Sequence, residues 1–179
     1  MNTNITIREA LPNEFSATGQ LMIEVYSHLE GFPTRQEMPD YYEMLANVGS
    51  LTQQADTRLL VALSPDVELW GAVVYFGNMK DYASGGEDID IDNASGIRLL
   101  AVDIKTRGMG VGRALTQACI EIAKASKHDQ VVLHSTKLMK VAWAMYEKMG
   151  FKRSADLDFN LHGLSIFGFR LDIRQNDTQ

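Results

Sequence analysis

Three glycines occur within residues 108–112 of this chain, in the segment Arg107-Gly-Met-Gly-Val-Gly-Arg113. Glycine has no Cβ, so the backbone of such a loop can approach a ligand closely, and several main-chain N–H groups can point at one anion. A run of branched apolar residues from Ile97 precedes the loop, and a helical pattern up to Lys124 follows it. A strand, a glycine-rich loop and the positive end of a helix dipole together are typical of a phosphate-binding site.

The spacing of the loop residues excludes two common nucleotide-binding motifs. A P-loop requires Gly-Lys followed by Ser or Thr, which is absent here. A dinucleotide fingerprint, Gly-x-Gly-x-x-Gly or Ala, fails because its third position falls on Arg113 or on Leu115. The pattern that remains is Arg-x-x-Gly-x-Gly, at Arg107, Gly110 and Gly112. The alternative interpretation is a tight strand-to-helix turn that binds nothing, because short glycine motifs recur by chance.

The composition is that of an ordinary globular protein with one domain. The chain has 179 residues, of which 45% are hydrophobic, and a formal net charge of −6. This charge argues against broad nucleic-acid binding and is compatible with a cationic substrate. The N-terminus shows no apolar leader and no stretch is long enough to span a membrane, so we expect a cytoplasmic location and no membrane partner. The one cysteine, Cys119, excludes an internal disulfide framework and is expected to pack in the core.

Hydrophobic periodicity predicts alternating strands and helices. The expected strands are 5–8, 58–63, 68–76, 97–104, 130–135, a strand that begins at 151, and 164–172. The expected helices are 13–30, a second one from 36 or 39 to 48, one from the glycine loop to 124, and 138–149. A turn at Ser64-Pro65-Asp66 makes the second and third strands an antiparallel hairpin. The short apolar strand 130–135 is expected to lie parallel to the strand before the loop, through a right-handed crossover.

The segment 78–93 is acidic and contains Glu87, Asp88, Asp90 and Asp92. Alternating carboxylates suggest a calcium loop, but the glycine and the distal glutamate of an EF-hand loop are missing. We interpret the segment as a solvated surface loop with a strand-like end at Ile89 and Ile91, and we predict no metal site.

A second motif lies later in the chain, where Ala142-Trp-Ala-Met-Tyr146-Glu-Lys-Met-Gly150-Phe151 has the pattern Ala-x-x-x-Tyr-x-x-x-Gly-Phe. Together with the earlier loop, in this order and at this separation, it resembles the GCN5-related N-acetyltransferase (GNAT) family over nearly all of residues 3–172. The resemblance implies an α/β GNAT fold: a mixed central sheet of about six to seven strands with flanking helices, in which the parallel strands before the loop and at 130–135 splay apart. One acetyltransferase domain would span residues 1–174, with a disordered tail at 175–179.

The resemblance also implies a site for acetyl-CoA as co-substrate. The pantetheine arm would pair with a free strand edge at Val102, Asp103 and Ile104, with the Val102 N–H as donor to the thioester oxygen. Tyr146 matches the family's usual general acid, which protonates the sulfur of coenzyme A. An isolated tyrosine on this helix would otherwise be interpreted as a core or boundary residue. The pyrophosphate would rest on the main-chain N–H groups of the loop, which comprises Arg107, Gly108, Met109, Gly110, Val111, Gly112 and Arg113.

Two positions depart from the family's pattern. Many members carry asparagine, which touches the pantetheine arm, at the position of Met139. Many also carry a glutamate as general base near the positions of Gly96 and Arg98, and neither residue is acidic. A lone histidine on a strand is more often a packing residue than a base. The other candidates for the base, none of which we assign, are water and the side chains of Glu68, Asp90, Asp92 and His134.

The functional hypothesis is an N-acetyltransferase that moves an acetyl group from acetyl-CoA to a primary amine of a small molecule or peptide by direct attack. One alternative is a different acyl donor, such as succinyl-CoA, because the loop does not contact the acyl chain. Another is a non-catalytic acyl-CoA sensor on the same fold, which the missing carboxylate favours and Tyr146 opposes. A homodimer is a further hypothesis because dimers are common in the family, and no nucleic-acid partner is expected.

Overall fold

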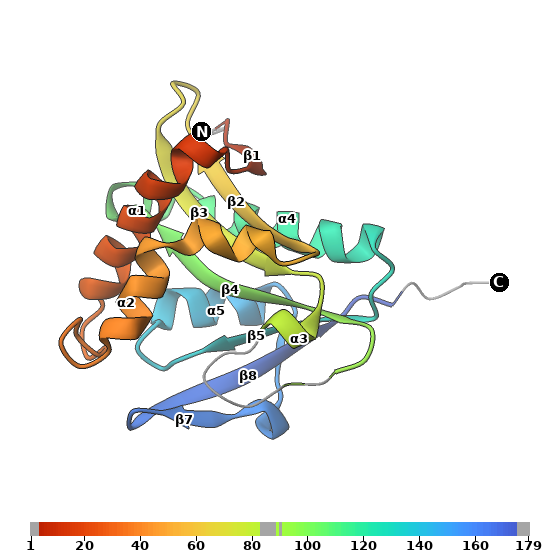
Figure 1. Cartoon of the computed structure of the whole chain (residues 1–179). Coiled ribbons are helices and arrows are strands. Elements are labelled where there is room, and N and C mark those ends of the chain that lie inside the picture. The colour runs from red at the N-terminus through yellow and green to blue at the C-terminus, as the bar shows by residue number, and fades with distance from the viewer. Residues whose placement is uncertain (1–3, 83–88, 90, 175–179) are drawn as a thin grey trace.

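The computed structural model describes residues 4–82, 89 and 91–174, which form one eight-stranded sheet with helices on both sides (Figure 1). The strand order is β1-β2-β3-β4-β5-β8-β6, and β7 pairs with β8. The strands are β1 (Thr6–Glu9), β2 (Thr57–Leu63), β3 (Leu69–Phe76), β4 (Ala94–Val102), β5 (Gln130–Ser135), β6 (Lys152–Arg153), β7 (Phe159–Leu161) and β8 (Leu164–Asp172). The helices are α1 (Phe15–Ser27), α2 (Pro39–Ala46), α3 (Met79–Tyr82), α4 (Val111–Ala125) and α5 (Lys140–Lys148), with 3₁₀ turns η1 (Pro12–Glu14), η2 (Val48–Gln53), η3 (Ile104–Thr106) and η4 (Ala155–Leu157).

The sheet is mixed because the chain uses two kinds of connection. The strands β1 to β4 follow one another as antiparallel neighbours. In contrast, β4 and β5 are parallel, so the chain must cross the sheet between them, and α4 makes this crossover. The strand β8 then returns antiparallel to β5. The predicted hairpin and the predicted parallel pair are both confirmed.

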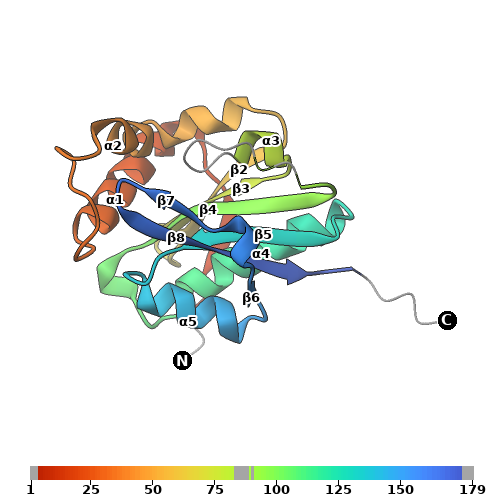
Figure 2. The same ribbon diagram turned by 90° about the horizontal axis from the view of Figure 1, so that it is seen from below.

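Helices cover both faces of the sheet, and each face buries its own core. In Figure 2, α1, α2 and α3 lie on one face, and α4 and α5 lie on the other. Val73 and Val74 are adjacent on β3 and belong to different cores, because successive side chains of a strand point to opposite faces. Val74 packs with Met22 on the α1/α2 face, whereas Val73 packs with Leu115 on the α4/α5 face.

Several predicted boundaries differ from those of the structure. The helix expected at 13–30 is divided into η1 and α1, and it ends at Ser27, before the chain turns through Gly31 at a φ of +81°. The sheet has eight strands rather than six or seven, because β6 and β7 are short strands that pair with β8. Cys119 is fully buried in α4, so the prediction that it packs in the core is confirmed.

The strands β4 and β5 separate after a short paired segment. Their parallel register ends at the pair Ile97–Leu133, although β4 continues to Val102 and β5 to Ser135. The last part of β4 therefore has β3 along one edge and, among the described residues, an unpaired edge on the side of β5. We call this separation the β4–β5 gap. It confirms the splayed pair that the resemblance implied.

A bulge in β4 lies at the start of the gap. The register between β3 and β4 shifts between Ala72 and Val74, and Leu99 has a φ of +59°. A positive φ costs a residue with a Cβ about 1–3 kcal/mol, so it persists only where the surrounding structure holds it. Leu99 is buried in the core on the α1/α2 face, and this packing holds the bulge in place.

The acidic segment 78–93 is covered only in part. It begins with α3, and the predictions made for Glu87, Asp88 and Asp90 lie outside the described residues, as does the predicted tail at 175–179. Within the described part of the chain, no group of three or more His, Cys, Asp or Glu side chains could hold a metal ion. None of the helices in that part is long and apolar enough to cross a membrane.

Candidate active site

A cavity of about 430 Å³ opens at the β4–β5 gap, and we call it the central cavity. This volume suits a small organic group. Six parts of the fold line it: α1, the segment between α1 and α2 with α2 itself, β4, β5, α5, and the β7–β8 hairpin. The lining includes Tyr26, Phe32, Glu37, Met38, Asp40, Tyr41, Met44, Ile97, Arg98, Leu99, Leu100, His134, Met139, Tyr146, Phe159, Leu161 and His162.

The central cavity reaches both faces of the sheet. Ile97 and Tyr146 belong to the core on the α4/α5 face, and Tyr26 and Leu99 belong to the core on the α1/α2 face. All four residues line the same cavity. A ligand that approaches from one face can therefore meet a ligand that approaches from the other at the β4–β5 gap.

The edge of β4 that faces the gap offers main-chain donors. The N–H of Asp103 donates to the carbonyl oxygen of Trp70 on the β3 side, at 2.8 Å. Because N–H groups alternate in direction along a strand, those of Val102 and Leu100 face away from β3, toward the gap. The Tyr26 hydroxyl lies 3.5 Å from the carbonyl oxygen of Leu100, which agrees with this orientation.

The predicted strand edge extends beyond β4 at two of its three positions, Asp103 and Ile104. The strand ends at Val102, and Asp103 begins η3 by accepting a 2.8 Å hydrogen bond from the N–H of Lys105. Ile104 is an exposed residue of that turn. The position that the sequence reasoning missed is Leu100, which lines the central cavity, whereas Val102 does not. The sequence contains no signal for Leu100, because its main chain offers the contact and its side-chain type does not matter.

The glycine loop lies directly before α4 and is open to solvent. Gly108 and Gly110 have φ values of +81° and +84°, and a Cβ at either position would meet nothing within 4 Å. The first intrahelical bond runs from the N–H of Ala114 to the carbonyl oxygen of Gly110. The preceding N–H groups at 111–113 therefore have no acceptor within the helix and are donors for a ligand.

Three cations lie beside this loop, around a second hollow of about 500 Å³ between α4 and α5. Arg113 comes from the first turn of α4, and Lys140 and Lys148 come from the two ends of α5. No carboxylate lines the hollow, and none of the three cations has an ion-pair partner among the described residues. Val141 in the same hollow is 82% exposed. The hollow can therefore take an anion together with a flat apolar group.

Tyr146 is buried in the α4/α5 core and also lines the central cavity. Its ring packs edge-on against Phe151, with centroids 5.8 Å apart. The hydroxyl has no hydrogen-bond partner within the described part of the chain, so it is available to a ligand. Burial raises the pKa of this hydroxyl, which stays protonated at physiological pH.

Met139 lies at the start of α5 and lines the central cavity. The Ser135 hydroxyl approaches its sulfur at 3.9 Å. A thioether cannot donate a hydrogen bond. Met139 therefore does not supply the polar contact that the family's asparagine makes at this position.

The absence of a carboxylate on β4 has a local structural reason. A Cβ at Gly96 would lie 2.1 Å from the ring of Tyr82, so this position excludes any larger residue. Arg98, two residues later, donates from Nη1 to the carbonyl oxygen of Tyr82 at 3.1 Å. The ring of Tyr82 and the guanidinium of Arg98 therefore occupy the space beside the two positions at which the resemblance implied a base.

His134 is held by both of its ring nitrogens. Nε2 lies 2.9 Å from the carbonyl oxygen of Leu157, which can only accept, so Nε2 carries the proton. The hydroxyl of Tyr82 then donates to Nδ1 at 2.7 Å. Burial lowers the pKa of His134, in agreement with a neutral ring. These contacts favour the packing role over that of a general base.

Two of the carboxylates that the sequence offered as bases, Glu68 and Asp92, do not line the cavity. Glu68 is exposed in the turn between β2 and β3, Asp92 is exposed before β4, and Asp90 lies outside the described residues. Two other carboxylates line it instead, those of Glu37 and Asp40. Their position could not be read from the sequence, because they follow an irregular segment between two helices.

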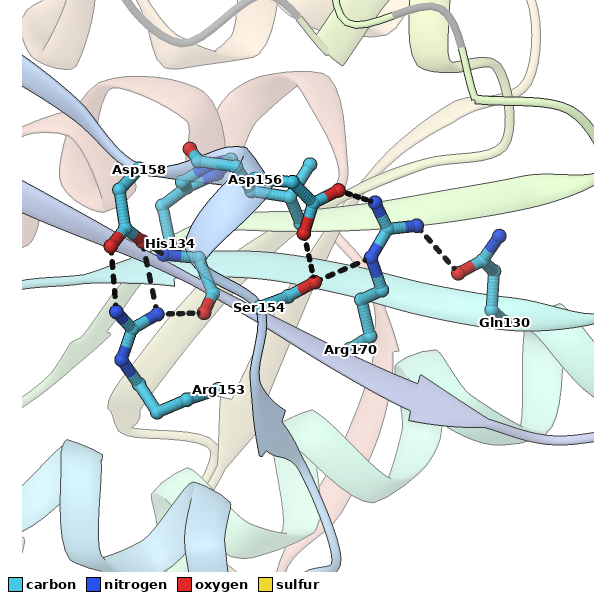
Figure 3. A network of polar contacts seen from close by, with 9 residues as sticks. Gln130, His134, Arg153, Ser154, Asp156, Asp158 and Arg170 are labelled. Carbon is cyan, nitrogen blue, oxygen red and sulfur yellow. Dashed lines mark hydrogen bonds and ion pairs between the residues drawn. The ribbon is translucent and has the colours of Figure 1, made fainter.

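A polar network fixes the wall of the cavity that carries His134 (Figure 3). Arg153 forms a bidentate pair with Asp158, at 2.7 and 3.0 Å, and this pair lowers the pKa of Asp158. Arg170 reaches Ser154 at 2.8 Å and Asp156 at 2.5 Å. These contacts join η4 to β8, and so they place the Leu157 carbonyl that His134 contacts.

Residues 79–173 match the profile of the Acetyltransferase (GNAT) domain. The match covers more than half of the chain and includes β4, the glycine loop, Tyr146 and β8. The chain belongs to the GNAT acetyltransferase family. The sequence motifs at Arg107–Gly112 and Ala142–Phe151 therefore resembled the correct family.

The curated relatives match this GNAT chain over only part of its length and part of their own. N-acetylaspartate synthetase of Danio rerio is 35% identical over 75 residues, which cover 41% of this chain and 27% of that protein. The matched segments span between 24% and 38% of the lengths of the curated relatives. A GNAT acetyltransferase of Staphylococcus aureus Mu50 superposes with a TM-score of 0.73 at 16% identity, covering 95% of this chain and 99% of that one. The PaiA N-acetyltransferase of Thermoplasma acidophilum, in complex with coenzyme A, gives 0.69 at 17% identity, over 92% and 98%.

Proposed function

We propose that this GNAT protein transfers an acetyl group from acetyl-CoA to a primary amine of a small molecule or peptide by direct attack. The observation that carries the proposal is the central cavity, which joins the two faces of the sheet at the β4–β5 gap and contains the Tyr146 hydroxyl. A coenzyme on one face and an amine on the other can meet there. The name of the Danio rerio relative, which states that it makes N-acetylaspartate, is consistent with an N-acetyltransferase.

Acetyl-CoA supplies an acetyl group that is activated as a thioester, and the residues on the α4/α5 face fit this ligand. The N–H groups at 111–113 are donors for the pyrophosphate. The other loop residues from Arg107 onward add further donors, except Met109, whose N–H donates to the carbonyl oxygen of Thr106 at 3.2 Å. Arg113, Lys140 and Lys148 surround a hollow that no carboxylate lines among the described residues, which suits the 3′-phosphate of the coenzyme. The edge of β4 at Leu100 and Val102 is the place for the pantetheine arm.

The proposed reaction forms a C–N bond and breaks a C–S bond. When the amine nitrogen attacks the thioester carbon, negative charge develops on the carbonyl oxygen, and a fixed N–H donor stabilises this charge. We assign the donor to Leu100, whose N–H faces the gap within the central cavity, with Val102 further along the same edge. The departing thiolate takes a proton from the Tyr146 hydroxyl, and the amine releases its proton to solvent or to a base.

Tyr146 carries the proton that a general acid must supply. Burial raises the pKa of its hydroxyl, so the protonated form is present throughout the physiological pH range. The hydroxyl has no acceptor among the described residues that would compete for its hydrogen. A general acid contributes typically 10²–10⁴-fold to a rate. Homodimerisation and a cytoplasmic location stay predictions.

Formation of an acetylated product tests the proposal. Purified protein is incubated with acetyl-CoA or succinyl-CoA and a panel of primary amines, and the products are identified by mass while free thiol is measured. We expect one acetylated amine for each thiol released, with acetyl-CoA preferred. Binding of acetyl-CoA without any acylated product would instead support the non-catalytic sensor, and equal use of succinyl-CoA would support a broader acyl donor range.

A further inference from the structure

Arg98 is the only lysine or arginine among the described residues that line the central cavity. Its guanidinium lies on the α1/α2 face, with its central carbon 5.9 Å from the ring centre of Phe76 and 6.0 Å from that of Tyr82. Nη1 donates to the carbonyl oxygen of Tyr82 at 3.1 Å. These contacts place a fixed positive charge on the face opposite to Tyr146.

The charge of Arg98 acts on several groups of that face. Burial raises the pKa of Tyr41 to about 12, and the guanidinium opposes this rise. It acts in the same direction on Tyr26 and Tyr82, whose pKa values burial also raises. Tyr26 and Tyr41 line the central cavity together with Arg98, so the guanidinium lies close to the space that a ligand would occupy.

We propose that Arg98 binds the carboxylate of the acceptor, and that the acceptor is an amino acid with a single carboxylate and an apolar side chain. The inference rests on the proposed function and specifies its acceptor. A guanidinium has five N–H donors, of which a bidentate carboxylate uses two. The contact with Tyr82 and the other interactions of Arg98 can therefore persist when the acceptor binds. The acceptor's amine is attached to the same carbon as its carboxylate, so it then lies beside β4 at the gap.

The residues that line the cavity around Arg98 form an apolar surface for the acceptor's side chain. Phe32, Met38 and Met44 line the cavity from the α1–α2 side, and Phe159 and Leu161 line it from the β7–β8 hairpin. Aromatic rings stack there edge-on, with 5.4 Å between the centroids of Tyr26 and Phe32. An apolar side chain is favoured in such surroundings because its burial removes apolar surface from water.

The same wall opposes a second carboxylate on the acceptor. Glu37 and Asp40 line the cavity near the start of α2. The N–H of Thr34 donates to Glu37 at 2.7 Å and lowers its pKa, so this carboxyl is ionised at neutral pH. A second carboxylate on the acceptor would share the cavity with these acidic side chains, without a further Lys or Arg among the described lining residues to pair with it. An apolar amino acid is therefore preferred over aspartate.

Three acceptors that differ in one group each test the inference: L-phenylalanine, phenethylamine, which lacks the carboxylate, and L-aspartate, which carries a second one. Binding is measured by calorimetry and acetylation by product mass, for wild type, Arg98→Gln and Arg98→Lys. The matched control is Arg58→Gln, which removes the same charge from β2 at a residue that pairs with Glu9 outside the cavity. Thermal unfolding and acetyl-CoA affinity are recorded for each variant.

We expect wild type to prefer L-phenylalanine at least about tenfold over both other acceptors in kcat/KM. Arg98→Gln should lower kcat/KM for L-phenylalanine about 10–100-fold, as expected for a lost charged hydrogen bond, and change that for phenethylamine less than about threefold. Arg98→Lys should give an intermediate loss because ammonium lacks the planar fork. Arg58→Gln should match wild type.

Faster turnover of phenethylamine or aspartate by wild type would overturn the inference, as would an equal loss for L-phenylalanine and phenethylamine in Arg98→Gln. If Arg98→Gln does not fold, the inference is tested by Arg98→Lys and by the comparison of the three acceptors in wild type. The proposed function fails separately, through a lack of acetyl-CoA binding. In that case, binding of L-phenylalanine that depends on Arg98 still tests the carboxylate contact.

Discussion

Ile97 on β4 pairs with Leu133 on β5, and this pair is the last in the parallel register of the two strands. Beyond it β4 continues for five residues to Val102, while β5 ends at Ser135. The edge of β4 therefore loses its partner where the central cavity opens. The separation of two strands, more than any single side chain, allows groups on opposite faces of the sheet to meet.

Replacing Tyr146 with phenylalanine tests the general acid. Tyr146→Phe keeps the ring packed against Phe151 and removes only the hydroxyl, which has no partner among the described residues. We expect kcat to fall by about 10²-fold or more, with acetyl-CoA affinity within about threefold of wild type. Steady-state kinetics and calorimetry give the two values.

Tyr75→Phe is the matched control for this change. Tyr75 is also buried in the α4/α5 core, and its hydroxyl has no hydrogen-bond partner within the described part of the chain. It does not line the central cavity, so its loss should leave kcat unchanged and stability equal or higher. A similar kcat in both variants and in wild type would remove the proton-donor role from Tyr146.

Gly112→Ala is expected to have opposite effects on stability and on coenzyme binding. Gly112 lies in the first turn of α4, and an added Cβ would make ordinary contacts at 3.5 Å with Met145 and Val102. Alanine is favoured over glycine in a helix by roughly 0.5–1 kcal/mol, so the melting temperature should rise slightly. The same Cβ points between β4 and α5, where the coenzyme would lie, so acetyl-CoA affinity should fall. Equal or higher affinity would contradict this placement.

Lys148→Gln tests the basic hollow between α4 and α5. Lys148 lies there with Arg113 and Lys140, and no carboxylate in the described part of the chain lines the hollow. We expect coenzyme A to bind severalfold more weakly, and the loss to shrink as salt is raised. Dephospho-coenzyme A, which lacks the 3′-phosphate, should bind equally to both proteins. Lys124→Gln on the far part of α4, where Lys124 pairs with Glu121, serves as the control. The same loss for both ligands would place the phosphate elsewhere.

The burial of His134 predicts how stability depends on pH. Burial lowers the pKa of His134 below its ordinary value of 6.5. The unfolded chain therefore takes up a proton on this histidine more readily than the folded chain does. Stability should fall as the pH drops below about 6.5, with a slope of up to about 1.4 kcal/mol per pH unit from one such group.

Urea unfolding of wild type and His134→Gln between pH 7.5 and 5.5 measures this effect. Glutamine can still donate to the Leu157 carbonyl and accept from Tyr82, but it does not titrate in this window. The variant should lose part of the wild-type slope, whereas His28→Gln on the exposed end of α1 should keep it. Identical slopes in wild type and His134→Gln would mean that His134 titrates alike in both states.

The parts of the site that depend on local chain geometry could be predicted from the sequence. Gly108 and Gly110 adopt positive φ values that glycine takes without strain, so their types and spacing marked the loop. The order of strands and helices around the loop followed from hydrophobic periodicity and from the two motifs. The parallel pair β4–β5 followed because a helix must connect parallel neighbours.

The parts that depend on distant contacts could not be predicted. Tyr82 and His134 are 52 residues apart, and nothing near either residue indicates their hydrogen bond. The position of Arg98 in the cavity depends on the bulge at Leu99, where a leucine adopts a φ of +59° that its type disfavours. The strand edge was extended too far, through Asp103 and Ile104, because the turn that ends β4 is stabilised by a side-chain cap.

The most direct test of the account is calorimetric titration of the wild-type protein with acetyl-CoA, with free coenzyme A as the comparison and Gly110→Val as the binding-site variant. Gly110 has a φ of +84° at the start of α4, and valine there would both strain the loop and cover its N–H donors. The account predicts saturable, one-to-one binding of acetyl-CoA that the variant loses while it remains folded. Absence of binding to the wild type, or unchanged binding to the variant, would contradict it.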